Sequence, residues 1–590
     1  MNEIQRDAAL KGARWGGQTS LTGALSRRSE RLEEALADLA RLRAWADCRD
    51  GCLGGARLAS VRPLAALNRP ITAVAAFESV PAGRAAAPNA VILAAAGAAL
   101  EAREPRKAAE LYQRMVDRHA AGRLAVSEDE LYEAEKGLFW AHLDADELGA
   151  AREQARKNYA QGTIEPPEGR ALWGAGDWKR TDARVALGLS EIYTGRPAAG
   201  ERIFSEMLAQ APANVAALSG LSAAKTARGL PRAAWENALA ARLHAPDDLG
   251  AAVRLAHSLM DARRWAEAHE IIQALGPWAA QSRAVSQLAR RWELFKKFEA
   301  RASFGFAHTS NRNSVSSTNP EDPNIELRLY SPPLGYHWRA FIGSAWDSGR
   351  YAEGEGEREM FLGGLQYRGP GLEFSLEARD ERLNGRRLGA GLEGLWQPGD
   401  HWRVPFSVQK NSRAAPLRAV NSNIRADSAS LGLGYYWHES RALNFNAQMM
   451  NFTDGNRRAA FSGNFSQRLW AGGHRTVTGR LNAYTSSNSE DDNRPYYNPK
   501  KDAEAGLGLT YANLLWRGEG KSLSHALEAD ASRYRQENYG TETIWTLGYH
   551  QSLDWADSFS ASYGASYGHR VYDGEPEKNI NGYINFVWKF

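Results

Sequence analysis

The chain ends with INGYINFVWKF, residues 580–590, and this stretch sets the question of fold for the second half. Every second residue from Ile580 to Phe590 is apolar or glycine, whereas the residues between them are mostly polar. Alternation with period two predicts a β-strand with one apolar face. Such a strand suits the end of a soluble sandwich or of a membrane barrel, so the rest of the chain must distinguish the two.

The length and composition limit the choices. A chain of 590 residues is too long for one core and predicts at least two domains. The net charge is only +4, from 73 basic and 69 acidic residues, so we expect no nucleic-acid partner. No segment approaches the ~20 continuous apolar residues that a membrane-spanning helix needs, but a membrane barrel needs no such segment.

The N-terminal half reads as a series of helices with an internal repeat. Residues 195–200, 229–234 and 263–268 have the sequences GRPAAG, GLPRAA and RRWAEA, and they follow one another at 34 residues. A helical period of 34 residues is typical of the tetratricopeptide repeat. We therefore expect an all-α tetratricopeptide-repeat superhelix over residues 1–296, clearest over 181–280. The alternative is a plain helical domain without that repeat geometry.

From about residue 297 the period changes to two. Alternating segments of roughly ten residues suggest about sixteen strands, and ten residues is the length of a tilted membrane strand. The links alternate between short turns, such as RGP at 368–370, and longer polar loops, such as 310–323, 348–359, 410–423 and 486–500. A regular alternation of short and long links between strands is typical of outer-membrane barrels, which have short turns at one rim and long loops at the other. We therefore predict an antiparallel transmembrane β-barrel over residues 297–590.

Tryptophans near the ends of the expected strands support this interpretation, because interfacial girdles use amphipathic rings. They are Trp338, Trp346, Trp396, Trp402, Trp437, Trp545 and Trp588. With an even number of strands, both ends of the barrel lie on the short-turn side. The sequence thus predicts a Gram-negative outer-membrane protein in contact with membrane lipids, with its repeat domain in the periplasm.

The same parity assigns side chains to the barrel lumen, which in a barrel of this size is a water-filled channel unless it is plugged. The candidate substrate path is Glu326, Glu373, Glu377, Glu393, Glu504, Glu528, Asp530, Tyr436, Tyr484 and Tyr583. The inward bases are Arg328, Arg339, Arg379, Arg403, Arg468 and Arg480. The carboxylates could attract a cationic passenger and the tyrosines could guide sugar rings. Alternatively, acids and arginines pair with one another and hold the barrel's shape.

Catalytic motifs are missing from the sequence, so we expect no enzyme activity, no cofactor and no metal site. Glu373 and Glu377 lie roughly 13 Å apart on one strand face, too far for a pair of glycosidase acids. Cys48 and Cys52 could form a local disulfide or be two incidental thiols.

Several segments resemble the outer-membrane export porins for poly-β-1,6-N-acetyl-D-glucosamine, of the PgaA/HmsH type. The resemblance rests on RLYSPPL at 328–334, RADSASLGLGYYWHESRALN at 425–444, NFTDGNRR at 451–458, NRPYYNPKKD at 493–502 and YDGEPE at 572–577. It implies a passive conduit for a partly de-N-acetylated exopolysaccharide during biofilm formation. It also implies that the periplasmic repeats engage the polymer or its deacetylase. A signal peptide and further repeats would be expected before Met1.

Two other functions fit the same architecture. The barrel could export another exopolysaccharide such as cellulose. It could also be a surface receptor or adhesin whose long loops bind a partner without transport, which a plugged lumen would favour.

Overall fold

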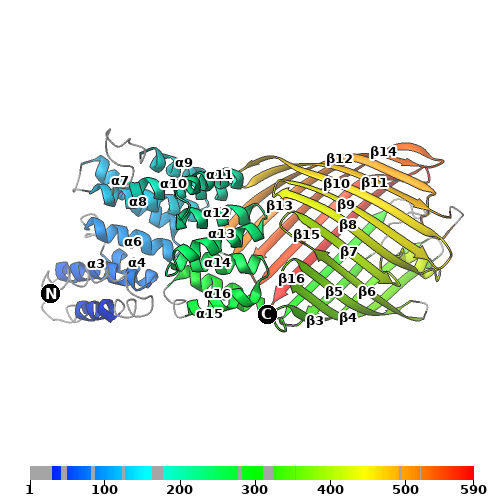
Figure 1. Ribbon diagram of the computed structural model, residues 1–590, viewed down its shortest axis with the longest axis horizontal. Coiled ribbons are helices and arrows are strands. Elements are labelled where there is room, and N and C mark those ends of the chain that lie inside the picture. The colour runs from blue at the N-terminus through cyan, green and yellow to red at the C-terminus, as the bar shows by residue number, and fades with distance from the viewer. Residues whose placement is uncertain are drawn as a thin grey trace. The chain divides into compact units, whose positions relative to one another are not determined.

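The structure is a computed structural model with a helical N-terminal part and a C-terminal β-barrel (Figure 1). It describes residues 30–40, 50–80, 87–122, 126–161, 177–276, 282–309, 323–351, 354–383, 385–490, 494–518 and 520–590. Cys48 and the side chain of Cys52 lie outside this description, so the disulfide stays a prediction. Among the described residues, no helix has the length and apolar character to cross a membrane.

The helices form hairpins along the N-terminal part. Their bounds are α3 (Asp50–Ala66), α4 (Pro70–Glu78), α6 (Asn89–Glu101), α7 (Pro105–Ala120), α8 (Glu128–Asp144), α9 (Leu148–Gln161), α10 (Asp177–Tyr193), α11 (Pro197–Gln210), α12 (Val215–Ala227), α13 (Pro231–His244), α14 (Leu249–Asp261), α15 (Trp265–Leu275) and α16 (Arg283–Phe295). Helices α11, α13 and α15 begin 34 residues apart, and so do α12, α14 and α16. The expected 34-residue repeat is therefore present as helical hairpins, which confirms a tetratricopeptide-like region.

Small residues let the paired helices approach closely. A Cβ added at Gly200 would lie 2.5 Å from Ile192 Cγ1 and 2.8 Å from the carbonyl oxygen of Gly188. Ala234 and Ala268, which occupy the same place in the next two repeats, are fully buried. The turn before each second helix also repeats, because Gly195, Gly229 and Arg263 all have positive φ. A left-handed residue at this point ends the first helix of each hairpin.

Sixteen antiparallel strands form one closed barrel. Their bounds are β1 (Glu299–Thr309), β2 (Asn324–Tyr330), β3 (Trp338–Tyr351), β4 (Gly354–Gly369), β5 (Leu372–Arg382), β6 (Arg386–Trp396), β7 (Trp402–Lys410), β8 (Ala426–His438), β9 (Arg441–Phe452), β10 (Arg457–Gly472), β11 (Arg475–Asn488), β12 (Lys501–Gly518), β13 (Lys521–Gln536), β14 (Gly540–Trp555), β15 (Phe559–Tyr572) and β16 (Glu575–Lys589). A short helix, α17 (Leu417–Asn421), lies between β7 and β8. The predicted fold class and strand number are confirmed.

The C-terminal sequence closes the barrel. β16 pairs with β15 on one side and with β1 on the other, in a register that runs from Glu299 opposite Lys589 to Thr309 opposite Asn579. Closure gives every strand of the barrel a neighbour on each side, as a structure in lipid requires. The strand that resembled the end of a sandwich is thus the seam of a membrane barrel.

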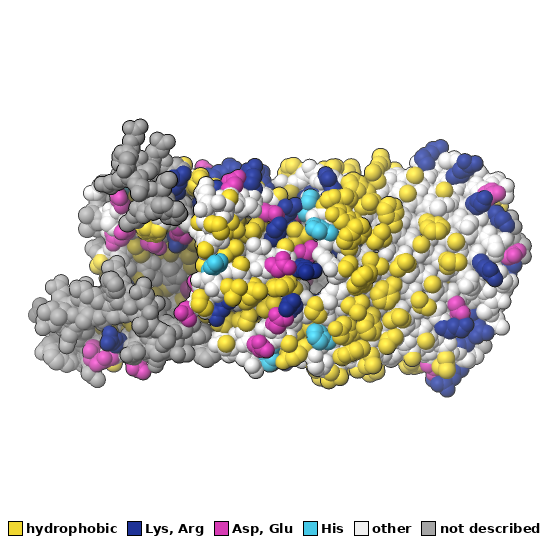
Figure 2. All heavy atoms as spheres, in the orientation of Figure 1, with side chains coloured by type: hydrophobic (Ala, Val, Ile, Leu, Met, Phe, Trp, Pro, Cys, Tyr) yellow, Lys and Arg dark blue, Asp and Glu magenta, His cyan; other side chains and the backbone are white. Residues whose placement is uncertain are grey.

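The outer surface carries an apolar band, which Figure 2 shows across the barrel strands. Tryptophans gather at the short-turn ends of the strands, at 338, 396, 402, 437, 470, 516, 555 and 588, and all are at least 36% exposed. Their position beside the apolar band is that of an interfacial girdle. Trp346 and Trp545 lie farther along their strands and away from this rim.

The predicted loop over residues 348–359 is wrong. Strands β3 and β4 stay paired as far as Tyr351 opposite Gly354, and Arg350 and Glu355 form an ion pair of 2.8 Å near the tip of this hairpin. The polar segment keeps the period-two pattern and extends the hairpin, because polar side chains on a strand are compatible with pairing outside the membrane.

The chain divides into two compact units by its internal contacts. The second unit contains the barrel, residues 289–590, together with the segments 225–235 and 256–270; the remaining residues form the first unit. Helix α16 ends at Phe295 and β1 begins at Glu299. The expected domain boundary after residue 296 stays a prediction.

Candidate functional site in the barrel lumen

Alternate side chains of each strand face the barrel interior. On β13, Leu527 on the outer face is 50% exposed, whereas Glu528 and Asp530 take part in contacts with strands that are not their neighbours. Side chains can reach past an intervening strand only on the concave side of a barrel. Such contacts therefore identify the lumen side of β13 as the side that carries Glu528 and Asp530.

The first lumen cluster joins β2 to β5 and to the loop after β7. Arg328 Nη2 lies 3.0 Å from Glu377 Oε2 although β3 and β4 stand between their strands, and Arg328 also pairs with Glu326. Glu377 in turn accepts a hydrogen bond of 3.0 Å from Arg379. Gly343 on β3 makes room for this pair, because a Cβ there would lie 3.2 Å from Arg328 Cγ.

A second lumen cluster extends from β11 to β16. Arg480 on β11 lies 2.7 Å from Asp530 and 3.3 Å from Glu528, both on β13. His550 Nε2 lies 3.3 Å from Glu528, and its Nδ1 lies 3.0 Å from the hydroxyl of Tyr583 on β16. Seven predicted residues are thus held in two charge networks. The arginines are Arg328, Arg379 and Arg480, and the carboxylates are Glu326, Glu377, Glu528 and Asp530.

Glu373 lies at the short-turn end of the barrel. Its carboxylate is 2.6 Å from Arg263 and 3.9 Å from Arg368, and it accepts a hydrogen bond of 3.2 Å from Gln366. Arg263 belongs to segment 256–270 of the same compact unit. Glu373 is therefore part of a local ion-pair network and not an isolated lumen acid.

The remaining predicted residues differ in their surroundings. Tyr484 accepts a hydrogen bond of 2.9 Å from Arg458, and Tyr436 lies under the guanidinium of Arg403 at 3.7 Å. Glu393 and Glu504 make no ion pair or hydrogen bond with any residue that the structure describes. Glu504 stands opposite Tyr484 and Tyr534 in the ladders. Among the predicted acids, these two are the ones without an ion-pair partner in the described part of the chain.

Two loops on the long-loop side fold into the barrel mouth. In residues 411–425, Arg413 reaches back to Glu326 on β2 at 2.6 Å, and Arg358 on β4 donates to the carbonyl oxygen of Arg413 at 3.4 Å. The loop after β11 contributes Tyr496, which is only 2% exposed and stacks on Phe452 of β9 at 4.7 Å. Both loops share one apolar cluster formed by Leu383, Ala415, Leu417, Ala419, Val420, Ala426, Met450, Phe452 and Tyr496.

The second tyrosine of the same loop anchors its other side. Tyr497 is 4% exposed, its hydroxyl lies 2.5 Å from that of Tyr534 and 3.1 Å from Gln536, and its ring packs edge-on against Tyr572. Burial raises the pKa of the Tyr496 and Tyr497 phenols above the ordinary value, so both stay neutral and act as hydrogen-bonding groups.

These loop residues were not among the predicted site residues. The loops were expected to be long and polar at the surface, but APLRAV at 415–420 and PYY at 495–497 are apolar or aromatic runs within polar surroundings. Such runs indicate burial, and here the available apolar surface is inside the barrel mouth. The lumen is therefore lined by polar and charged side chains and narrowed by structured loops at its outer end.

The lumen clusters are built from charged and hydrogen-bonding side chains of the described residues. The lumen networks consist of carboxylates, guanidinium groups, imidazole and phenols in mutual contact. Among the described residues, no group of three or more His, Cys, Asp and Glu is placed to hold a metal ion.

Comparison with known proteins gives a consistent picture. Residues 298–590 match the family described as the PgaA membrane beta barrel domain. Two relatives, the poly-beta-1,6-N-acetyl-D-glucosamine export proteins of Escherichia coli K12 and O157:H7, are each 26% identical over 506 residues, which is 84% of this chain. The chain spans 60% of the length of these relatives.

Two solved structures are each similar to about half of the chain. A bacterial polysaccharide outer membrane secretin is 26% identical, covers 50% of this chain and 99% of its own, and has a TM-score of 0.47. A tetratricopeptide repeat protein from Parabacteroides merdae is 12% identical, covers 48% of this chain and 97% of its own, and has a TM-score of 0.32.

Proposed function

Residues 298–590 belong to the PgaA membrane beta barrel domain family, and from this premise we propose that the protein exports poly-β-1,6-N-acetyl-D-glucosamine across the outer membrane. The polymer passes through the barrel lumen, partly de-N-acetylated, during biofilm formation. The observation that carries the proposal is a closed barrel of this family whose lumen is lined by polar and charged side chains.

The lumen acids divide into two groups with different proposed roles. Glu326, Glu373, Glu377, Glu528 and Asp530 are bound to arginines and hold the barrel and its mouth in shape. Glu393 and Glu504 have no such partner among the described residues, and they attract the free amines of the polymer. Tyr436, Tyr484 and Tyr583 line the path along which sugar rings pass.

The helical repeats bind the polymer or the deacetylase that modifies it, as the resemblance implies. No step of this proposal requires catalysis by the chain itself, so we propose a conduit and not an enzyme. The curated relatives are named as export proteins.

A receptor or adhesin without transport has one observation in its favour. The loops after β7 and β11 are folded into the mouth and share an apolar cluster, which narrows the lumen. The same narrowing is compatible with an exporter, in which these loops act as a gate that excludes other solutes while no polymer is passing.

A deletion strain separates the two functions. If the protein is an exporter, the strain still synthesises poly-N-acetylglucosamine, accumulates it inside the cell envelope and shows none at the surface, and the intact gene restores export. Normal surface polymer in the deletion strain would contradict the proposal. Another exopolysaccharide as cargo would appear as loss of that polymer instead.

A further inference from the structure

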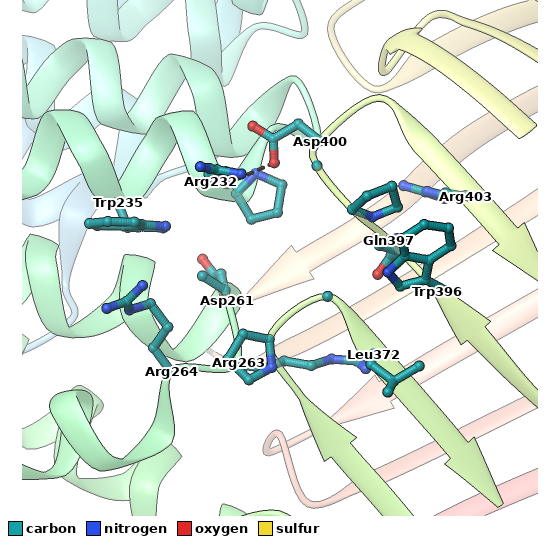
Figure 3. Close-up of a pocket in the computed structure, with 17 residues that line it drawn as sticks. Arg232, Trp235, Asp261, Arg263, Arg264, Leu372, Trp396, Gln397, Asp400 and Arg403 are labelled. Atoms are coloured by element: carbon teal, nitrogen blue, oxygen red, sulfur yellow. Dashed lines mark hydrogen bonds between the residues drawn. The ribbon is translucent and has the colours of Figure 1, made fainter.

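A pocket of about 410 Å³ lies within the second compact unit, away from the lumen clusters. Its walls come from segments 225–235 and 256–270 and from the turns that join β4 to β5 and β6 to β7 (Figure 3). Figure 3 shows Trp235, Asp261, Arg263 and Trp396 around one space. The volume is within the range of small-ligand pockets.

Arginines outnumber aspartates in the lining, although Arg263 and Arg264 are paired with Glu373 and Glu267 at 2.6 Å each. Four arginines line the pocket against two aspartates: Arg232, Arg263, Arg264 and Arg403 against Asp261 and Asp400. Both aspartates are already engaged, because Asp400 accepts from the backbone N–H groups of Arg232 and Ala233 at 2.8 and 2.9 Å. Asp261 accepts from Arg291 at 2.6 Å. An anionic ligand suits such a lining better than a cationic one.

Two of the arginines retain unused donors. Arg264 pairs with Glu267 and stacks on Trp235 at 4.4 Å, but its Nε is buried and has no hydrogen-bond partner among the described residues. Arg403 makes no ion pair in the part of the chain that the structure describes, and its buried Nε is likewise without an acceptor. Buried donors without partners call for an acceptor, and phosphate oxygens match the guanidinium fork.

The apolar side of the pocket meets the membrane surface. Trp396, which is 51% exposed, ends β6 on the face that carries the apolar band, and Leu372 begins β5 on the same face. The headgroup layer extends roughly 5–8 Å beyond each side of the hydrocarbon core. A pocket that begins at a girdle tryptophan therefore lies at the depth of lipid phosphates on the short-turn side.

We infer that this pocket binds the phosphate of a phospholipid of the inner, periplasmic leaflet of the outer membrane. Arg264, from segment 256–270, and Arg403, on the lumen-facing side of β7 at the rim, donate to the phosphate oxygens over the end of the barrel wall, while the acyl chains lie along Trp396 and Leu372 on its outer face. A glucosamine unit with a free amine is disfavoured here, because it would add a positive charge to a lining with excess arginine.

Native mass spectrometry of the full chain in detergent, titrated with dioleoyl-phosphatidylglycerol, tests the inference. We expect the doubly substituted Arg264→Gln, Arg403→Gln protein to bind the lipid roughly tenfold or more weakly than the wild type, as the loss of charge-assisted hydrogen bonds predicts. The matched control is the doubly substituted Arg533→Gln, Arg535→Gln protein. It lacks two exposed arginines near the C-terminal end of β13, which is at the long-loop rim of the barrel and not at the rim that carries the pocket. The control should bind as the wild type does.

A second variant distinguishes a lipid from a free anion. Trp396→Ser removes the exposed ring along which the acyl chains lie and leaves the arginines in place. It should therefore weaken lipid binding, while retained heat-modifiable mobility shows that the barrel is folded. Unchanged lipid affinity in Trp396→Ser, or inorganic phosphate that binds as tightly as the lipid, would overturn the inference. Equal affinity in the double-arginine variant and the wild type, or displacement of lipid by a glucosamine oligomer, would overturn it as well.

Discussion

Arg480 on β11 contacts Asp530 on β13 at 2.7 Å although β12 lies between the two strands. The contact is possible because β12 carries Gly508 at the crossing point. A Cβ there would overlap Asp530 Oδ1 and lie 3.0 Å from Arg480 Nε. The contact between Arg480 and Asp530 thus depends on the glycine at position 508, so a single added methyl group can disturb it.

Gly508→Ala is expected to break the second lumen cluster. The added methyl group displaces Asp530 or Arg480, and overpacking of this kind costs about 1–3 kcal/mol. We expect the temperature at which the folded barrel unfolds in detergent, read from heat-modifiable mobility, to fall. The matched control is Gly363→Ala, where a Cβ would meet only the carbonyl oxygen of Phe341, at 3.9 Å. Equal unfolding temperatures for the two variants would contradict the crossing argument.

Neutralising paired and unpaired lumen acids should have different effects. Glu377→Gln leaves Arg328 and Arg379 short of a counter-charge, so the barrel is expected to lose stability. Glu393→Gln with Glu504→Gln should leave stability unchanged, because neither carboxylate has a described partner. In cells, the second variant is expected to slow release of de-N-acetylated polymer selectively, measured as surface against retained polymer. Unchanged release would show that lumen acids act on structure alone.

The barrel was predictable because two independent patterns agreed. Period-two alternation assigned the faces, and loop length assigned the two rims. The 34-residue repeat was equally clear, because GRPAAG and GLPRAA mark the same hairpin turn in successive units. Local sequence patterns of this kind predict the structure well, because each strand or helical hairpin buries the face on which its own apolar residues lie.

The interactions of the site were less predictable. Parity places Glu377 in the lumen, but only the three-dimensional register shows that Arg328 reaches it from three strands away. The inward course of loop 411–425 depends on Arg413 meeting Glu326, a contact between residues far apart in sequence. The period-two alternation of side chains also continues through residues 348–359, where the polar composition wrongly predicts a loop.

Alkaline pH should destabilise the helical part through Tyr112. Burial raises the pKa of this phenol from 10.0 to about 12. The folded state therefore keeps the proton that the unfolded state releases, so the contribution is complete below pH 10 and is lost as the pH rises from 10 to about 12. The loss amounts to about 2–3 kcal/mol. We expect the far-UV helical signal of Tyr112→Phe to persist to higher pH than that of the wild type. Tyr193→Phe, which changes a 40% exposed ring, is the control and should behave as the wild type does.

Arg413→Ala should widen the mouth of the barrel. The Arg413–Glu326 pair of 2.6 Å holds loop 411–425 toward β2, and its loss frees the start of the loop from the wall. The apolar cluster around Leu417 and Tyr496 still holds the rest of the loop, so we expect partial opening and not loss of fold. Single-channel conductance in planar bilayers should therefore rise, while heat-modifiable mobility stays as in the wild type. Arg425→Ala, at the other end of the same loop, removes an exposed arginine whose side chain makes no hydrogen bond or ion pair with the described residues, and it should leave conductance unchanged. A conductance for Arg413→Ala equal to that of the wild type would mean that the ion pair does not restrict the opening.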